Sequence, residues 1–215
     1  MKQLLLDLSS AKPALSNFVR GRNGEVLEAL EDLASGRSGE RMVYLWGEEG
    51  CGRSHLLLAC CNEAGPDSRY VACSPDTKFD FDADFTAVDD VENLGGEGQV
   101  SLFHLCNRIR ERGGILLASG NLPPSRLHLR PDLATRLGWG LVYQLHVLDD
   151  GEKREALRAH AKMLGFELPS DVEDYLMNHA RRDLPALVRI IDALDEYSRE
   201  SKRHVTIPLL KEIMK

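Results

Sequence analysis

The segment from Gly47 to Ser54 constrains the fold of this chain more than any other part of its sequence. It reads Gly-Glu-Glu-Gly-Cys-Gly-Arg-Ser. Glycines at these positions let the backbone curl so that successive N–H groups point at phosphate oxygens. The apolar run Met42 to Trp46 precedes the segment, and a helical pattern from Arg53 to Asn62 follows it. Because a helix N-terminus adds positive potential, this order predicts a phosphate-binding loop, the P-loop, for a nucleoside di- or triphosphate.

One position of the P-loop departs from the usual pattern. Arg53 stands where the pattern has lysine, so the charge is kept on a bulkier, planar group that we expect on the β-phosphate. Ser54 supplies the hydroxyl that reaches Mg²⁺ in such loops. The alternative is a glycine-rich turn without a ligand, which the glycine spacing between a strand and a helix disfavours. The expected nucleotide contacts are Gly50, Cys51, Gly52, Arg53, Ser54 and His55, with no role for the Cys51 thiol.

A second element matches the P-loop. The apolar strand that starts at Phe85 ends in two acids, Asp89 and Asp90. We assign Asp89 to the metal, together with Ser54, and Asp90 to the orientation of an attacking water. Acid pairs are common at strand ends, so this signal gains its weight from the P-loop that precedes it. Asn121 follows another predicted strand and is either a residue that orients water or a turn residue before Pro123.

Strand and helix patterns alternate through the first two thirds of the chain. Apolar runs predict strands at 42–46, 69–73, 85–89, 115–119 and 141–145, and helical spacing occupies 24–35, 53–62 and 99–112. Asn23 is the expected cap of the first helix. Continuous apolar strands that alternate with helices predict an α/β fold with a doubly wound parallel sheet of five strands.

The pattern changes near residue 149. Helices are predicted at 152–164, 170–180, 184–199 and 208–214, with a short strand near Val205. We therefore divide the chain into a flexible tail at 1–14, a nucleotide-binding domain at 15–149 and a small all-helical domain at 150–215.

Composition excludes several function classes. The formal net charge is −7, from 34 acidic residues against 27 Lys and Arg, which argues against duplex DNA as the main partner. A basic cluster at Arg199, Lys202 and Arg203 leaves a local patch open, although a solvated helix end is the favoured interpretation. The five cysteines form no Cys-x-x-Cys pair, which disfavours a zinc site or a disulfide framework.

Hydropathy points to a cytoplasmic protein without a membrane partner. No apolar run approaches the roughly 18 residues that a membrane span needs. The N-terminal leucine run ends at Asp7, which is too early for a signal peptide.

Several segments resemble a known group. Leu15 to Asn23, Pro131 to Gly140 and Arg182 to Leu184, with the P-loop and the acid pair, look like the AAA+ ATPase core of the DnaA family of replication initiators. The length, the P-loop arginine and both ends of the chain resemble the Hda family of DnaA regulators. The resemblance implies an AAA+ domain followed by a helical lid domain, with ADP or ATP and Mg²⁺ as cofactors.

The resemblance also implies roles for single residues. Phe18, Val19 and Asn23 fall in the segment that lines the adenine, and Arg136 matches an arginine finger that reaches the γ-phosphate of a neighbour. Arg182, rather than Arg181, matches the lid arginine that contacts the nucleotide. Without the resemblance, a surface helix charge would be the simpler interpretation of each arginine.

The N-terminus carries a further motif. Gln3, Leu6 and Leu8 look like the Gln-x-x-Leu-x-Leu peptide by which replication proteins dock on the sliding clamp. An extended peptide presents alternate side chains, so both leucines can enter one apolar pocket. Short peptides of this kind also occur by chance, and the core that follows favours the docking interpretation.

The resemblance implies a regulator that docks on the β subunit sliding clamp of DNA polymerase III and promotes ATP hydrolysis by DnaA, with weak hydrolysis of its own. It leaves homo-oligomerisation open and makes any DNA contact indirect or weak. The first alternative is a free-standing AAA+ ATPase such as a helicase loader. The second is a small-molecule P-loop kinase, which the helical C-terminal part does not favour.

Overall fold

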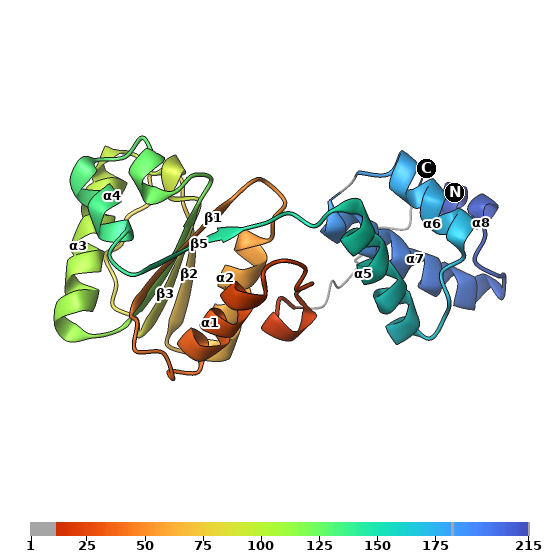
Figure 1. Cartoon of the computed structure of the whole chain (residues 1–215), viewed down its shortest axis with the longest axis horizontal. Helices are drawn as coiled ribbons and strands as arrows, with labels where there is room; N and C mark the ends of the chain where they lie inside the picture. Colours follow the sequence, from red (N-terminus) through yellow and green to blue (C-terminus); the bar gives the residue numbers. More distant parts are fainter. Residues whose placement is uncertain (1–11, 182, 215) are drawn as a thin grey trace. The chain divides into compact units, whose positions relative to one another are not determined.

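The computed structural model describes residues 12–181 and 183–214. The chain divides between Val147 and Leu148 into two compact units, a P-loop domain and a helical domain (Figure 1). The predicted clamp-binding residues Gln3, Leu6 and Leu8 lie outside the described residues, and so does Arg182, which was predicted to contact the nucleotide.

The P-loop domain is built on a five-stranded parallel sheet with the strand order β2-β3-β4-β1-β5. The strands are β1 (Met42–Gly47), β2 (Ser68–Ala72), β3 (Phe85–Asp89), β4 (Ile115–Gly120) and β5 (Leu141–Leu145). Val43 of the central strand β1 pairs with Leu117 of β4 on one side and Leu141 of β5 on the other. The predicted doubly wound α/β sheet is confirmed, and the strand bounds agree to within one residue.

Helices cover both faces of this sheet (Figure 1). The helices α1 (Gly24–Ala34) and α2 (Arg53–Ala64) cover one face, and α3 (Gly96–Arg112) and α4 (Pro131–Leu137) cover the other. Successive side chains of a strand point to opposite faces. Val43 and Leu45 therefore pack with α1 and α2, whereas Met42 and Tyr44 pack with α3 and α4.

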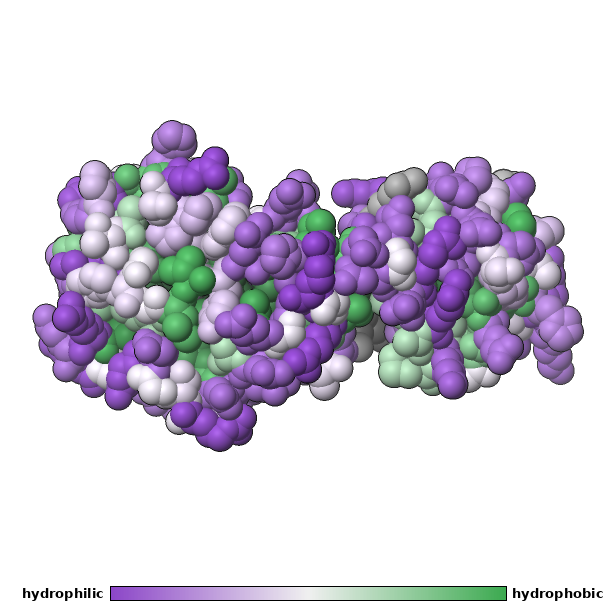
Figure 2. Space-filling view, in the orientation of Figure 1, coloured by the Kyte–Doolittle hydropathy of each residue, from purple (hydrophilic) through white to green (hydrophobic). Residues whose placement is uncertain are grey.

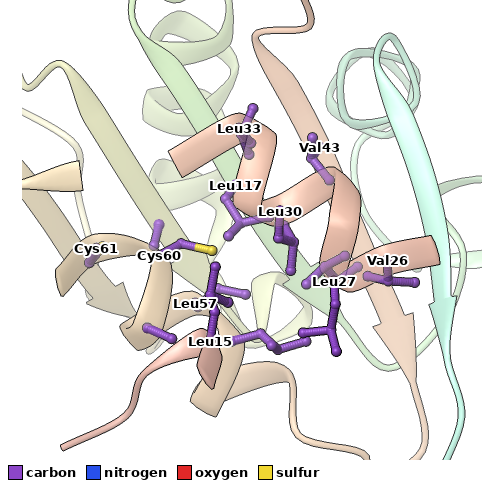
Figure 3. Close-up of a cluster of buried hydrophobic side chains, with 14 of the residues drawn as sticks. Leu15, Val26, Leu27, Leu30, Leu33, Val43, Leu57, Cys60, Cys61 and Leu117 are labelled. Atoms are coloured by element: carbon purple, nitrogen blue, oxygen red, sulfur yellow. The ribbon is translucent and has the colours of Figure 1, made fainter. Parts of the chain in front are cut away.

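An apolar core packs α1, near the start of the P-loop domain, against α2 and the sheet (Figure 3). Leu27, Leu30 and Leu33 of α1 meet Leu57 of α2 and Leu117 of β4 in one apolar cluster.

Three short 3-10 helices, at Leu15–Asn17, Val91–Asn93 and Pro124–Arg126, complete the described part of the domain.

The N-terminal part of this domain differs from the prediction at the cap of α1. Asn23 precedes α1, but its side chain forms no cap hydrogen bond. It is 1% exposed and instead pairs with the backbone of His146, through contacts of 2.8 and 2.9 Å. Before the first 3-10 helix, Asn62 of α2 donates to the carbonyl of Pro13 at 2.8 Å.

The helical domain contains α5 (Asp150–Leu164), α6 (Ser170–His179), α7 (Leu184–Ser201) and α8 (Ile207–Ile213). Asp149 and Glu152 form a capping box, so α5 begins two residues before the predicted start. The predicted short strand near Val205 is wrong. Val205 packs against the apolar core of the four helices and has no strand beside it.

The surface of both domains is largely hydrophilic in Figure 2. Within the described ranges, no helix combines the length and hydropathy of a membrane span. The basic cluster near the end of α7 is compensated in part, because Arg199 pairs with Asp195 and Arg203 pairs with Glu212 at 3.1 Å.

Candidate functional site

The P-loop connects β1 to α2 through backbone conformations that favour glycine. Gly50 and Gly52 have φ values of 81° and 98°, in the left-handed region. A Cβ on Gly47 would lie 2.5 Å from the carbonyl oxygen of Leu145, and a Cβ on Gly52 would lie 2.5 Å from the Phe18 ring. The glycine spacing of the sequence therefore corresponds to real close approaches in this loop.

Backbone N–H groups of the P-loop are available to a ligand. Cys51 N–H donates to the carbonyl of Glu48 at 3.2 Å, and α2 makes its first backbone bond from Leu56 to Gly52. Within the described residues, the N–H groups of Gly50, Gly52 and Ser54 have no acceptor. Donors of this kind at a helix N-terminus form a cradle that suits a phosphate group.

Arg53 does not extend away from the loop. Its Nη1 donates to the carbonyl of Gly47, and its Nη2 lies 3.1 Å from Oδ1 of Asp90. The Arg53 side chain is only 12% exposed. The charge of the predicted phosphate-binding arginine is thus compensated by a carboxylate in this structure.

Asp89 is held at the end of β3 by two hydroxyl groups. The Tyr70 hydroxyl donates to Oδ2 at 2.8 Å, and the Ser119 hydroxyl donates to Oδ1. Asp89 is 2% exposed, and burial raises the pKa of the Tyr70 phenol, with the hydrogen bond to Asp89 adding to the rise. Ser54 also interacts with the Tyr70 hydroxyl, so the two residues assigned to Mg²⁺ approach the same tyrosine.

Asp90 lies beside this network in the left-handed region, with φ 55°. Its N–H donates to the Ser119 hydroxyl at 3.2 Å. Partial burial, followed by the charge of Asp89, raises the pKa of the Asp90 carboxyl, and Arg53 partly offsets the rise.

Asn121 contributes its backbone to the same edge of the sheet. Its N–H donates to Oε1 of Glu92 at 3.0 Å, and the residue is exposed. The Oε2 atom of Glu92 is buried with no hydrogen-bond partner in the described chain, and burial raises the pKa of this carboxyl.

The N-terminal segment lies against the start of α2. The Phe18 ring packs at a centroid distance of 5.7 Å from the His55 ring, next to Gly52. Nε2 of His55 lies 3.1 Å from the carbonyl oxygen of Ala14. Phe18 and Val19 are half-buried. The structure therefore brings Phe18 and His55 to the P-loop, while the side chain of Asn23 is engaged with His146.

Arg136 lies near the end of α4, on the face of the sheet opposite α2. Its Cζ atom is 3.6 Å from the centroid of the Trp139 ring and 5.1 Å from that of Phe103. Its Nε donates to Oδ1 of Asn107 at 3.1 Å. We call Phe103, Asn107, Arg110, Arg136 and Trp139 the α3–α4 surface.

The other lid arginine considered in the sequence, Arg181, is 86% exposed in its side chain. It lies 3.5 Å from Asp183, which caps α7. For Arg182 the assigned role stays a prediction.

The sequence did not predict the side chains that contact Asp89 and Arg136. Tyr70 and Ser119 hold Asp89, and Trp139 holds Arg136. Tyr70 belongs to an ordinary edge strand, which gave no signal. Trp139 follows Arg136 by three residues inside a segment that already drew attention, so an aromatic residue near a candidate arginine was the available clue.

No metal site formed only by side chains accompanies these residues. The described ranges contain no cluster of three or more His, Cys, Asp or Glu side chains that could hold a metal ion. A cavity of about 470 Å³ lies elsewhere, between Ser68, Asp84 and Arg112, and includes none of the P-loop residues.

Comparisons with known proteins agree with this geometry. The family described as Hda, lid domain, matches residues 150–214. Domain III of DnaA from Thermotoga maritima is 20% identical, with a TM-score of 0.76 over 95% of this chain and 96% of that one. AMPPCP-bound DnaA from Aquifex aeolicus is 22% identical, with a TM-score of 0.71 over 91% of this chain and 71% of that one.

A mutant of RuvB from Thermotoga maritima has the same fold at 16% identity. Its TM-score is 0.68 over 94% of this chain and 71% of that one. The structural likeness thus defines the fold, which is that of DnaA domain III. Residues 150–214 match the family described as Hda, lid domain.

Proposed function

We propose that this chain is an adenine-nucleotide-binding regulator of bacterial replication initiation. Docked on the sliding clamp, it would promote ATP hydrolysis by DnaA through Arg136. The observation that carries the proposal is the Hda lid match at residues 150–214, behind a P-loop domain with the DnaA fold.

Nucleotide binding is supported by the P-loop itself. The N–H groups of Gly50, Gly52 and Ser54 are free to donate to phosphate oxygens, and the Phe18 ring lies beside Gly52. Ser54 and Asp89 would hold Mg²⁺. When bound, ADP or ATP with Mg²⁺ supplies the phosphate charge that these groups neutralise. The AMPPCP-bound DnaA of similar fold supports an adenine nucleotide.

Weak hydrolysis by the chain itself fits the same geometry. Asp90, the residue assigned to the orientation of water, is paired with Arg53 at 3.1 Å. A carboxylate that is already paired is a poor group for orienting an attacking water. The P-loop is therefore proposed to bind nucleotide rather than to turn it over rapidly.

Arg136 supports the action on a partner. ATP hydrolysis develops negative charge on the transferred phosphoryl group, and an arginine from a neighbouring subunit stabilises that charge. Arg136 is on the opposite face of the sheet from α2, and no carboxylate of the described chain lies within ion-pair distance of it. An unpaired guanidinium in this place is suited to meet the nucleotide of another molecule.

Clamp docking through Gln3, Leu6 and Leu8 belongs to the same proposal and rests on the sequence motif. DNA contact stays indirect, since Arg199 and Arg203 are paired with acids.

The test mixes the chain with DNA-loaded clamp and ATP-bound DnaA, and measures the ADP formed. We expect ADP formation well above that of either ATPase alone. Deletion of residues 1–8 should remove clamp binding and stimulation while ADP binding persists. If the chain alone forms ADP as fast as the mixture does, the regulator proposal fails and a free-standing AAA+ ATPase replaces it.

A further inference from the structure

The guanidinium of Arg136 is fixed from three sides. The Trp139 ring covers it at 3.6 Å, the Phe103 ring lies 5.1 Å away, and Asn107 accepts a hydrogen bond from its Nε. Phe103 and Asn107 are four residues apart on α3, so they lie on one face of that helix. Trp139 follows α4 in the chain, which places the arginine between two elements.

The contacts of Arg136 leave part of its hydrogen-bonding edge free. Nε is used by Asn107, but within residues 12–181 and 183–214 neither Nη1 nor Nη2 has an acceptor. When a guanidinium stacks on an aromatic ring, its N–H groups lie in the guanidinium plane and point outward, parallel to the ring. They can therefore still donate hydrogen bonds. The indole thus holds the group without consuming its donors.

The same indole carries a second cation. Cζ of Arg110 lies 4.4 Å from the centroid of the Trp139 ring. Arg110 is exposed, and it makes no ion pair with any described carboxylate. The electron-rich face of a tryptophan attracts arginine more strongly than a phenylalanine face does. Trp139 therefore concentrates positive charge at the α3–α4 surface while it restricts the motion of Arg136.

We propose that Trp139 is a positioning residue for Arg136, which orients the guanidinium before a partner's triphosphate reaches it. This inference rests on the proposed action of Arg136 on a neighbouring ATP. An arginine side chain loses rotamer freedom when it is ordered, and the contact with Trp139 orders it before the ATP reacts. Because Arg136 is proposed to meet negative charge that develops only in the transition state, Trp139 should change the maximal rate of stimulated hydrolysis rather than the affinity of the complex.

The test compares Trp139→Leu with Trp139→Phe in the clamp-dependent hydrolysis assay. Leucine keeps apolar volume but offers no π face, so we expect the maximal rate to fall about tenfold, and phenylalanine to restore most of it. The concentration that gives half-maximal stimulation should stay unchanged for both variants. A Leu variant with the parent maximal rate overturns the positioning role, and so does one that only weakens the complex.

A measurement without the partner tests the contact itself. The chain has two tryptophans, so in a Trp46→Phe background the emission reports Trp139 alone. Arg136→Ala should then shift that emission, because a cation leaves the ring face. An unchanged emission would contradict the stacked arrangement.

Failure of this inference is distinguishable from failure of the proposed function. If Arg136→Ala loses stimulation while Trp139→Leu keeps it, only the positioning role is wrong. If Arg136→Ala also stimulates as the parent does, the action of Arg136 on the partner is wrong, and the positioning role falls with it.

Discussion

Arg53 and Arg136 carry the same charge in opposite surroundings. Arg53 is 12% exposed, bonds to the Gly47 carbonyl and pairs with Asp90 at 3.1 Å. Arg136 has an aromatic ring and an amide as its neighbours, and no described carboxylate within ion-pair distance. The charge of the P-loop arginine is compensated within the domain, whereas the charge of the α3–α4 arginine has no described acid partner.

The difference concerns what each region can do with a phosphate. At the P-loop, a phosphate ligand would have to compete with Asp90 for Arg53, so we expect binding to depend largely on the backbone N–H groups. At the α3–α4 surface no internal carboxylate has to be displaced, and a guanidinium held ready costs less to order. The chain thus separates a site that is proposed to hold a nucleotide from a surface that is proposed to act on one.

The largest effect should come from Gly52→Val, which attacks only the P-loop side of the comparison. A Cβ at position 52 would lie 2.5 Å from the Phe18 ring, and the rest of a valine side chain would clash further. The φ of 98° at this position is also strained for valine. We expect ADP affinity to fall more than about a hundredfold in calorimetry. Gly39→Val is the matched control, since nothing lies within 4 Å of its Cβ.

When Gly52→Val is made in the Trp46→Phe background, Trp139 emission should match that of the Trp46→Phe protein, because the α3–α4 surface packs in a different core cluster from the P-loop. Parent-like ADP affinity would show that the backbone at Gly52 does not form the nucleotide site.

A smaller effect should follow from Asp90→Asn, which sharpens the account of the compensated charge. Because the folded-state pKa of Asp90 is raised by burial and by Asp89, its charged form is disfavoured in the fold. Stability from this group is therefore present at pH below its unfolded pKa of about 3.9 and is lost as pH rises through the raised folded value.

Asparagine at position 90 does not ionise, so the loss of stability at higher pH disappears, and its side-chain oxygen can still accept a hydrogen bond from Arg53. We expect Asp90→Asn to raise the melting temperature slightly at pH 7, with the difference shrinking toward pH 4. A variant that is less stable at pH 7 than at pH 4, relative to the parent, would mean that the pair with Arg53 outweighs burial.

The sequence was sufficient for the sheet and for the P-loop because both depend on local patterns. Buried parallel strands read as apolar runs, and the loop needs glycine where φ is positive. All five strands were found, and the close approaches of Gly47 and Gly52 agree with the expected backbone turn.

Features set by contacts between distant segments could not be predicted in this way. Asn23 looked like a helix cap, but the backbone of His146, far along the chain, competes for its side chain. The sequence around Val205 was compatible with a short strand, but Val205 packs against the core of the helical domain, and that packing is not visible in the local pattern. The stacking of Trp139 on Arg136 also depends on how α4 packs on α3, which no local pattern encodes.

The proposed function depends most on the action of Arg136 on the ATP of a neighbouring molecule. We predict that Arg136→Ala and Arg136→Lys both retain ADP and clamp binding, since the residue lies on the face opposite α2. Lysine lacks the planar fork, so both variants should lower stimulated hydrolysis about a thousandfold. Arg112→Ala, an exposed arginine at the end of α3, is the matched control and should stimulate fully.

The decisive measurement is the ADP formed from ATP-bound DnaA in a single turnover, with loaded clamp and each variant in turn. The account predicts full stimulation by the parent and by Arg112→Ala, and almost none by Arg136→Ala or Arg136→Lys. Stimulation by Arg136→Ala equal to that of the parent would contradict the account.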